Sequence, residues 1–366
     1  MKSVIMRAPG EKLEIIDVPK PKLKIGAVLL ETIYSEVCGT DCHIHNGRLN
    51  GVPYPIIPGH ISVGRIMEMN GSVVDCHGVK FDIGDAVGFF DVYDTCGKCW
   101  YCTVADSKTK CPYRKVYGVT VGVEDPLMGG WSEGIHIKPN VSLLRLPKNV
   151  TPEMYISGGC GLFTGFHAVE RAEIKLGDTV VVQGSGPVGI YSAVFAMLSG
   201  AYKVIVIGAP KQRLNLTKKF GVNEVFNIET STEEERLKSI QELTNNTGAD
   251  VVIEASGNPK AVSEGFNIVR DGGTYIIVGH YTDNGSVKIN PHIDINKKHV
   301  TVKGCWGLTF SIKYRALKML DLHHDHFPWE ETISAFYGLE KANQALNDVA
   351  SMSVVKAVIS PKITGT

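Results

Sequence analysis

From about residue 177 onward, short apolar runs alternate with helical stretches, and this rhythm restricts the fold more than any other feature of the sequence. Strands that alternate with helices form βαβ units, in which the strands are parallel and the helices cover the sheet. The sequence therefore predicts an α/β fold with a doubly wound parallel sheet. We expect strands at 179–184, 203–208, 249–256 and 273–279, and helices at 187–200, 213–221, 232–248 and 259–269.

The first part of the chain has a different character. Residues 1–155 are rich in glycine, proline and short β-like runs such as 27–34, 62–69 and 85–90. Such a pattern is typical of a mostly β, barrel-like domain with long loops, and here it predicts an all-β region.

Two domains are expected for a chain of 366 residues. The segment after residue 305 is mixed, with helices expected near 311–321 and 340–350 and a strand at the end. We predict one domain at 1–160, a second at 161–304, and a segment at 305–366 that completes the first domain.

Charge and apolar runs argue against several classes of protein. Lysine plus arginine and aspartate plus glutamate both total 38, which gives no reason to expect nucleic acid or an acidic membrane as a partner. The sequence contains neither a transmembrane run of apolar residues nor the apolar core of a signal peptide. We therefore expect a cytoplasmic protein.

Gly184, Gly186 and Gly189 form a G-x-G-x-x-G pattern that includes Pro187 and Val188. The pattern follows an apolar strand and opens a helix, which is the context of a dinucleotide-binding turn. Gly184 permits the tight turn, Gly186 lets the backbone approach a pyrophosphate, and Gly189 allows close packing of the helix on the strand. The helix N-terminus supplies amide donors. The alternative is a glycine-rich turn without a ligand. The context favours a Rossmann domain that binds a dinucleotide.

The end of the second strand bears on the choice between NAD and NADP. An acid at this point accepts hydrogen bonds from the ribose of NAD. The strand ends instead at Gly208, followed closely by Lys211 and Arg213, which can neutralise a 2′-phosphate. This slightly favours NADP. The alternative is that both cations are solvated and that NAD binds without the carboxylate.

Cysteines crowd into one short segment. Four of the nine lie at Cys96, Cys99, Cys102 and Cys111. Clustered cysteines in a chain without a secretion signal are more often metal ligands than disulfides. Four thiolates give a closed tetrahedral zinc site, which is structural because no coordination position stays open. An iron–sulfur cluster and two disulfides are the alternatives.

Three further residues that can bind metal are scattered along the chain. Cys38 follows a strand, His60 follows a proline-rich loop, and Cys160 lies in a glycine-rich segment before the dinucleotide turn. Free cysteines are usually buried core residues. Composition alone does not show that these three residues converge.

A family resemblance links these residues. The segment 38–43, PGH at 58–60, GDAV at 84–87, the four-cysteine segment, GCGLFTG at 159–165 and GSGPVG at 184–189 occur in one order and near one set of spacings. In these motifs the chain resembles the zinc-containing medium-chain alcohol dehydrogenases over essentially its whole length. The resemblance implies a GroES-like catalytic domain, with a structural zinc lobe at about 92–115, and a Rossmann domain.

The resemblance also implies a catalytic zinc held by Cys38, His60 and Cys160. Two cysteines and one histidine are the known protein ligands of the catalytic zinc in alcohol dehydrogenase, where substrate or water takes the fourth position. Such a zinc acts as a Lewis acid on an alcohol oxygen, so hydride can pass to the nicotinamide.

By the same resemblance, Thr40 accepts the released proton and passes it by way of the cofactor ribose to His43, whose pKa suits an outlet to solvent. Asp41 resembles the carboxylate that orients the histidine ligand. The alternatives are that Thr40 is a strand-end hydroxyl and His43 a surface imidazole.

One position departs from the family. Ile61 stands where a glutamate usually follows the ligand histidine, which removes a charge and an exchangeable ligand. We favour an active dehydrogenase with altered zinc–water exchange. Zinc-independent reductase or lyase chemistry on the same scaffold is the alternative.

Correspondence with the family suggests the remaining contacts. The pocket residues are mostly apolar or aromatic, which favours a secondary or cyclic alcohol over a sugar. Relatives assemble through the dinucleotide domain, so we expect a homodimer or homotetramer. The predicted pocket residues are Arg48, Tyr54, Val92, Phe163 and Trp306, and Thr164, Gly208 and Val278 are further predicted cofactor contacts.

Overall fold

The computed structural model describes residues 1–363 and divides the chain into two units. The first unit contains residues 1–159, 309–324 and the chain from 329 onward. The second contains residues 160–308 and 325–328. The second unit is therefore inserted into the chain of the first.

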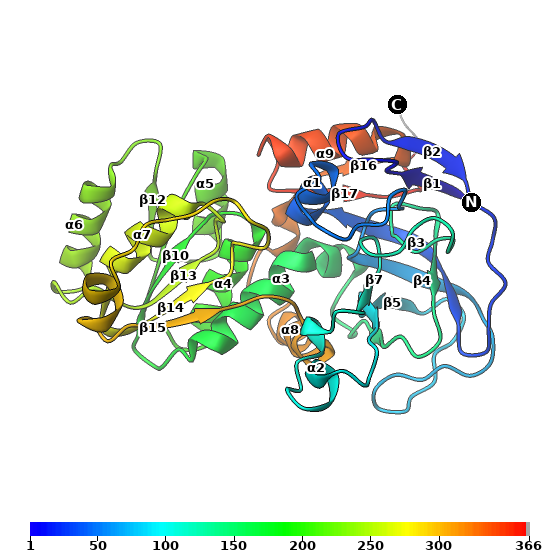
Figure 1. The fold of residues 1–366 in the computed structure, drawn as a ribbon, viewed down its shortest axis with the longest axis horizontal. Coiled ribbons are helices and arrows are strands. Elements are labelled where there is room, and N and C mark those ends of the chain that lie inside the picture. Colours follow the sequence, from blue (N-terminus) through cyan, green and yellow to red (C-terminus); the bar gives the residue numbers. More distant parts are fainter. Residues whose placement is uncertain (364–366) are drawn as a thin grey trace. The chain divides into compact units, whose positions relative to one another are not determined.

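A parallel sheet of six strands forms the centre of the second unit (Figure 1). The strands lie in the order β12–β11–β10–β13–β14–β15, which is the 3-2-1-4-5-6 order of a Rossmann fold. The predicted doubly wound sheet is confirmed. The bounds are β10 Thr179–Gln183, β11 Lys203–Gly208, β12 Glu224–Asn227, β13 Ala249–Glu254, β14 Val269–Ile277 and β15 Thr301–Gly304.

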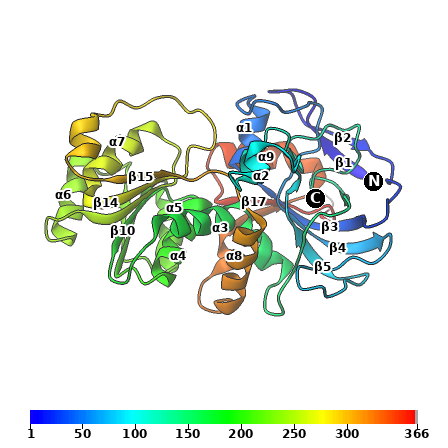
Figure 2. The ribbon, with the colours of Figure 1, turned by 60° about the horizontal axis from the view of Figure 1, so that its bottom comes forward.

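Helices cover this sheet on both faces (Figure 2). Helix α4 packs on β10 and β11, α5 packs on β11 and β12, and α7 packs on β13 and β14. The strand order reverses between β10 and β13, so the carboxyl ends of these strands form the edge where ligands bind in such folds. The bounds are α4 Pro187–Leu198, α5 Lys211–Lys219, α6 Glu233–Leu243 and α7 Pro259–Ile268.

The long strand β3 (Val28–Val37) is the centre of the first unit. It pairs antiparallel with β4, β8 and the C-terminal strand β17, so the end of the chain is part of this sheet. The mostly β fold predicted here is confirmed. The other strands are β1 Lys2–Ile5, β2 Glu14–Asp17, β4 Ser62–Met69, β5 Ala86–Phe89, β6 Val92–Asp94, β7 Lys115–Val116, β8 Gly134–Ile137, β9 Leu143–Arg145, β16 Ile333–Tyr337 and β17 Lys356–Ile359.

Helices α8 (Phe310–Leu322) and α9 (Ala342–Ala350) agree with the two helices expected after residue 305. Two short helices, α1 (Gly39–His45) and α2 (Trp100–Thr103), lie in the region predicted as all-β, so that prediction is wrong there. Both are too short to give a helical period in the sequence. None of the helices within residues 1–363 has the length and apolar character needed to span a membrane.

Helix α3, which runs from Pro152 to Ala172, was not predicted from the sequence. Glycines at 158, 159, 161 and 165 weaken its helical pattern, because glycine disfavours a helix interior. The helix is interrupted at Gly159, whose φ of 51° and ψ of −147° are non-helical. Cys160 follows this interruption directly.

Candidate metal centres and dinucleotide turn

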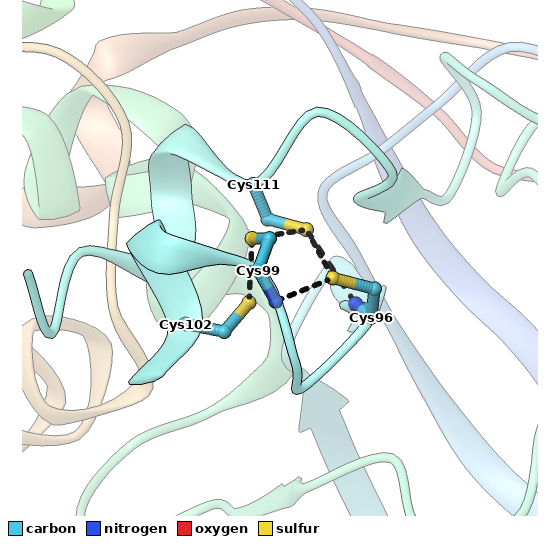
Figure 3. A group of neighbouring side chains, drawn as sticks. All are labelled: Cys96, Cys99, Cys102 and Cys111. Carbon is cyan, nitrogen blue, oxygen red and sulfur yellow. Dashed lines mark hydrogen bonds between the residues drawn. The ribbon is translucent and has the colours of Figure 1, made fainter. Parts of the chain in front are cut away.

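Four cysteine side chains point toward one another in the lobe that contains α2 (Figure 3). The Sγ of Cys99 lies 3.5 Å from that of Cys102 and 3.9 Å from that of Cys111. The Sγ atoms of Cys111 and Cys96 are 3.6 Å apart. Cys99 is the N-cap of α2, so the start of this short helix positions two of the four thiols.

These separations fit one zinc ion. A Zn–S bond of about 2.3 Å in a tetrahedral site places sulfur atoms about 3.8 Å apart. A disulfide needs an S–S distance of about 2.05 Å, and the four cysteines of the lobe form no disulfide, so the two-disulfide alternative is wrong. A hydrogen bond from the backbone amide of Lys98 is the main cause that lowers the pKa of Cys96 to about 6, whereas burial raises the pKa of Cys99 to about 11, so Cys96 is the thiol that most readily forms the thiolate that a metal binds.

A second group that can hold a metal consists of Cys38, Asp41 and His60. Cys38 lies between the end of β3 and the start of α1, and His60 lies just before β4. The backbone N–H of Glu36 on β3 donates to the carbonyl of Ile61 at 3.0 Å, so the pairing of neighbouring segments brings the two ligands together. The Sγ of Cys38 is 3.8 Å from Nε2 of His60.

The chemistry of this group also fits zinc. Zn–S and Zn–N bonds of ordinary length place sulfur and nitrogen about 3.6 Å apart in a tetrahedral site. Asp41 is buried, and its Oδ1 has no hydrogen-bond partner among residues 1–363. Such an acceptor costs free energy, which a nearby cation offsets. Its Oδ2 accepts the backbone N–H of Cys38 at 2.9 Å, and burial raises the pKa of the Asp41 carboxyl.

The structure thus groups Cys38 and His60 with Asp41. Cys160 lies on α3, in the second unit, and its Sγ is 3.7 Å from Oγ1 of Thr164. Its role as a third ligand stays a prediction.

The predicted relay residues lie on one short helix. Thr40 and His43 both belong to α1 and are partly buried. Burial, and after it the charge of Arg48, lowers the pKa of His43. The backbone N–H of Arg48 donates to the carbonyl of His43 at 2.9 Å, so a predicted pocket residue lies beside the predicted outlet for the proton.

The glycine turn has the geometry expected of a dinucleotide site. Gly184 follows β10 with a φ of 124°, a conformation that favours glycine. A Cβ at Gly189 would lie 1.9 Å from the carbonyl oxygen of Gly184, so the turn and α4 pack too closely for any side chain there. Gly186 is the N-cap of α4, and a Cβ added there would lie 3.7 Å from Nη1 of Arg213. Gly184 and Gly189 therefore form the tight turn and the close packing expected of them, and the approach of a pyrophosphate to Gly186 stays a prediction.

The end of β11 leaves no room for an acid. A Cβ at Gly208 would lie 2.4 Å from Oγ of Ser185, and this hydroxyl donates to the carbonyl of Ala209 at 3.0 Å. Lys211 begins α5 and is exposed, whereas Arg213 is partly buried. Burial lowers the pKa of Arg213.

The other predicted contacts lie as follows. Phe163 is fully buried on α3, and Val278 is buried just after β14. The indole N–H of Trp306 donates to the carbonyl of Tyr281 at 3.1 Å. Tyr54 donates to the carbonyl of Ile44. Val92 begins β6.

Two buried ion pairs near the metal group were not predicted. Lys356 Nζ lies 2.6 Å from Oε1 of Glu36, and Lys313 pairs with Asp91. The sequence feature that could have indicated these pairs is a charged residue within an apolar run, as Lys356 is in VVKAVIS at 354–360.

A G-x-G-x-x-G turn on a Rossmann sheet and a cysteine–histidine group that can hold a metal, both in one chain, indicate the class of metal-dependent nicotinamide oxidoreductases. Residues 24–148 match the model of the alcohol dehydrogenase GroES-like domain, and residues 187–322 match that of the zinc-binding dehydrogenases. The chain is 31% identical to a 5-exo-hydroxycamphor dehydrogenase of Pseudomonas putida over 95% of each chain. It is 30% identical to a sorbitol dehydrogenase of Bacillus subtilis over 97% of each.

An alcohol dehydrogenase from Thermotoga maritima has a similar structure, with a TM-score of 0.93 and 30% identity over 99% of each chain. The chain belongs to the zinc-containing medium-chain alcohol dehydrogenase family. It is a zinc-dependent oxidoreductase that acts on the CH–OH group of an alcohol with NAD(P).

Proposed function

We propose that Cys38, His60 and Cys160 hold the catalytic zinc, and that the four cysteines of the lobe hold a structural zinc. The distance of 3.8 Å between Cys38 Sγ and His60 Nε2, beside the buried Asp41, is the observation that carries the proposal. When bound, zinc supplies a Lewis acid that lowers the pKa of an alcohol.

The residues of α1 then hold and move the proton. Thr40 would accept the proton that the alcohol releases, and His43 would pass it to solvent, while a bound cofactor would supply the ribose hydroxyl of this relay. Burial lowers the pKa of His43, which favours the neutral imidazole, the form that can accept a proton. Asp41 accepts a hydrogen bond from the backbone of Cys38, which fixes that ligand segment at the start of the helix.

We propose a secondary or cyclic alcohol as substrate and NADP as the preferred cofactor. The residues assigned to the pocket are mostly apolar or aromatic, and one relative is named for a hydroxycamphor, a cyclic alcohol. For the cofactor, Ser185 occupies the space where an acid at position 208 would begin, and the cations Lys211 and Arg213 follow closely.

A panel of secondary, cyclic and polyhydroxylated alcohols, assayed with both cofactors, tests this proposal. We expect the highest kcat/KM for a secondary or cyclic alcohol and a lower KM for NADP than for NAD. Lys211→Ala with Arg213→Ala should raise KM for NADP about tenfold or more, because a hydrogen bond to a charged group contributes about 1.5–3 kcal/mol. KM for NAD should change little. Lys218→Ala, an exposed lysine on the same helix, is the matched control. A strong preference for NAD in the parent protein would contradict the NADP assignment.

We infer that the chain forms a homodimer or homotetramer. Strand β15 is at the edge of the six-stranded sheet, and its Val302 is exposed. An unpaired edge strand with an apolar side chain offers pairing to a second copy. Light scattering measures the molar mass, and a monomer at micromolar concentration would contradict this inference.

A further inference from the structure

We propose that Glu36 and Lys356 act as a positioning pair. They fix the bend of α3 just before Cys160 and so set the position of the Cys160 thiol as a metal ligand. This inference rests on the proposed role of Cys160. The buried ion pair that joins β3 to the C-terminal strand thereby has a function in metal binding.

The pair is buried almost completely. The Glu36 and Lys356 side chains are 3% and 1% exposed, and Nζ lies 2.6 Å from Oε1. A buried ion pair is weak evidence for stability, because the loss of hydration offsets most of the attraction. A function in positioning accounts better for two charges at this place than stability does.

Lys356 also holds α3. Its Nζ donates to the carbonyl of Gly158 at 3.1 Å. A carbonyl at a break in a helix needs a donor from outside the helix, and the ammonium supplies it just before the non-helical Gly159. The Lys356 ammonium therefore donates both to the Glu36 carboxylate and to the carbonyl at the interrupted end of the helix.

The bend at Gly159 packs tightly against the Glu36–Lys356 pair. A Cβ at Gly159 would lie 2.2 Å from Oε2 of Glu36 and 2.5 Å from Nζ of Lys356. The backbone of Gly159 is thus confined by both charged groups. Since Cys160 is the next residue, its entry direction is set by this confined bend.

Glu36 is the residue that connects the three ligand segments. It lies two residues before Cys38 on β3, and its N–H donates to the carbonyl of Ile61, the residue after His60. Its carbonyl accepts the indole N–H of Trp131 at 3.1 Å, which anchors it further. Its carboxylate reaches the bend before Cys160 through Lys356.

The test measures metal affinity, with Glu36→Gln as the first variant because it keeps the side-chain volume. Loss of a group that orients a metal ligand lowers metal affinity about 10- to 100-fold. We expect this loss at the catalytic site for Glu36→Gln and for Lys356→Met, with the structural zinc retained. Competition with a chelator measures the affinity. Replacement of the catalytic zinc by cobalt reports, through its thiolate absorption, the loss of one sulfur ligand.

Cys160→Ser separates this proposal from the one on which it rests. If Cys160→Ser leaves metal affinity unchanged, the proposed ligand role of Cys160 fails. If Cys160→Ser lowers the affinity but Glu36→Gln does not, the positioning pair is overturned and the ligand role stands. In the Cys160→Ser background, Glu36→Gln should have no further effect, because the pair acts through Cys160. Additive effects would overturn the proposal.

Glu264→Gln is the matched control. It breaks a different buried ion pair, Arg236–Glu264, which lies in the second unit with both side chains 8% exposed. This variant should lose stability without losing metal affinity. If Lys356→Met fails to fold, Glu36→Gln still decides the question. An equal loss of metal affinity in Glu264→Gln would show general destabilisation and contradict the proposal.

Discussion

Replacement of Cys38 by serine is expected to lower kcat/KM by about 10³-fold or more and to remove the catalytic zinc while the structural zinc stays. Serine keeps the shape of the side chain but removes the thiolate. The metal contributes several kcal/mol of charge stabilisation in the transition state, and each 1.4 kcal/mol corresponds to about tenfold in rate. Of the three proposed ligands only His60 and Cys160 remain, and the group of Cys38, Asp41 and His60 loses its sulfur.

Zinc content by atomic spectroscopy and kcat/KM with a good substrate from the alcohol panel measure the effect. Cys76→Ser is the matched control, because Cys76 is exposed, free and outside both metal groups. We expect this control to keep both its zinc and its activity. A Cys38→Ser variant with unchanged zinc content would show that the catalytic metal is bound elsewhere.

Local patterns in the sequence predicted the second unit well. The strands at 179–184 and 203–208 correspond to β10 and β11, because a buried parallel strand is a continuous apolar run that stands out between glycine turns. The four-cysteine lobe is equally local, since its ligands span only sixteen residues and three of them lie within seven.

The catalytic group could not be derived in the same way. Cys38 and His60 come together because Glu36 and Ile61 pair their backbones, and which segments pair is a tertiary property. Only the family resemblance linked the two residues. Asp41 was assigned to an orienting role, and its presence within the group of possible ligands became evident only from the structure.

The buried ion pairs were missed for a related reason. Glu36 and Lys356 are 320 residues apart, and Asp91 and Lys313 are 222 apart. A charged residue in an apolar run indicates that a partner exists, but it does not indicate where in the sequence the partner lies. The same applies to α3, where packing and Lys356 stabilise a glycine-rich helix against its own propensity.

The second large effect is expected at Lys313, whose side chain is fully buried and pairs with Asp91. Lys313→Met should lower the free energy of unfolding by about 3–5 kcal/mol, because removal of one partner leaves an uncompensated buried charge. For a unit of this size, that corresponds to a fall in Tm of about 6 to 20 °C. Scanning calorimetry at pH 8 measures it. The double variant Asp91→Leu with Lys313→Met should recover to within about 1 kcal/mol of the parent or exceed it.

The pH dependence of this loss gives a sharper test. Burial raises the pKa of Asp91, but the charge of Lys313, with His60 and hydrogen bonds, more than offsets this, so the pKa in the folded protein is lowered. In the parent, this contribution to stability is present above the unfolded pKa and is lost as pH falls through the folded pKa. In Lys313→Met, burial is largely uncompensated, and the pKa of Asp91 should rise above its unfolded value. As pH falls, protonation of Asp91 then removes the uncompensated buried charge, so the variant loses less stability relative to the parent. The gap in Tm between parent and variant should therefore narrow from pH 8 to pH 5. A constant or widening difference in Tm would show that the variant is destabilised by lost packing and not by the unpaired carboxylate of Asp91.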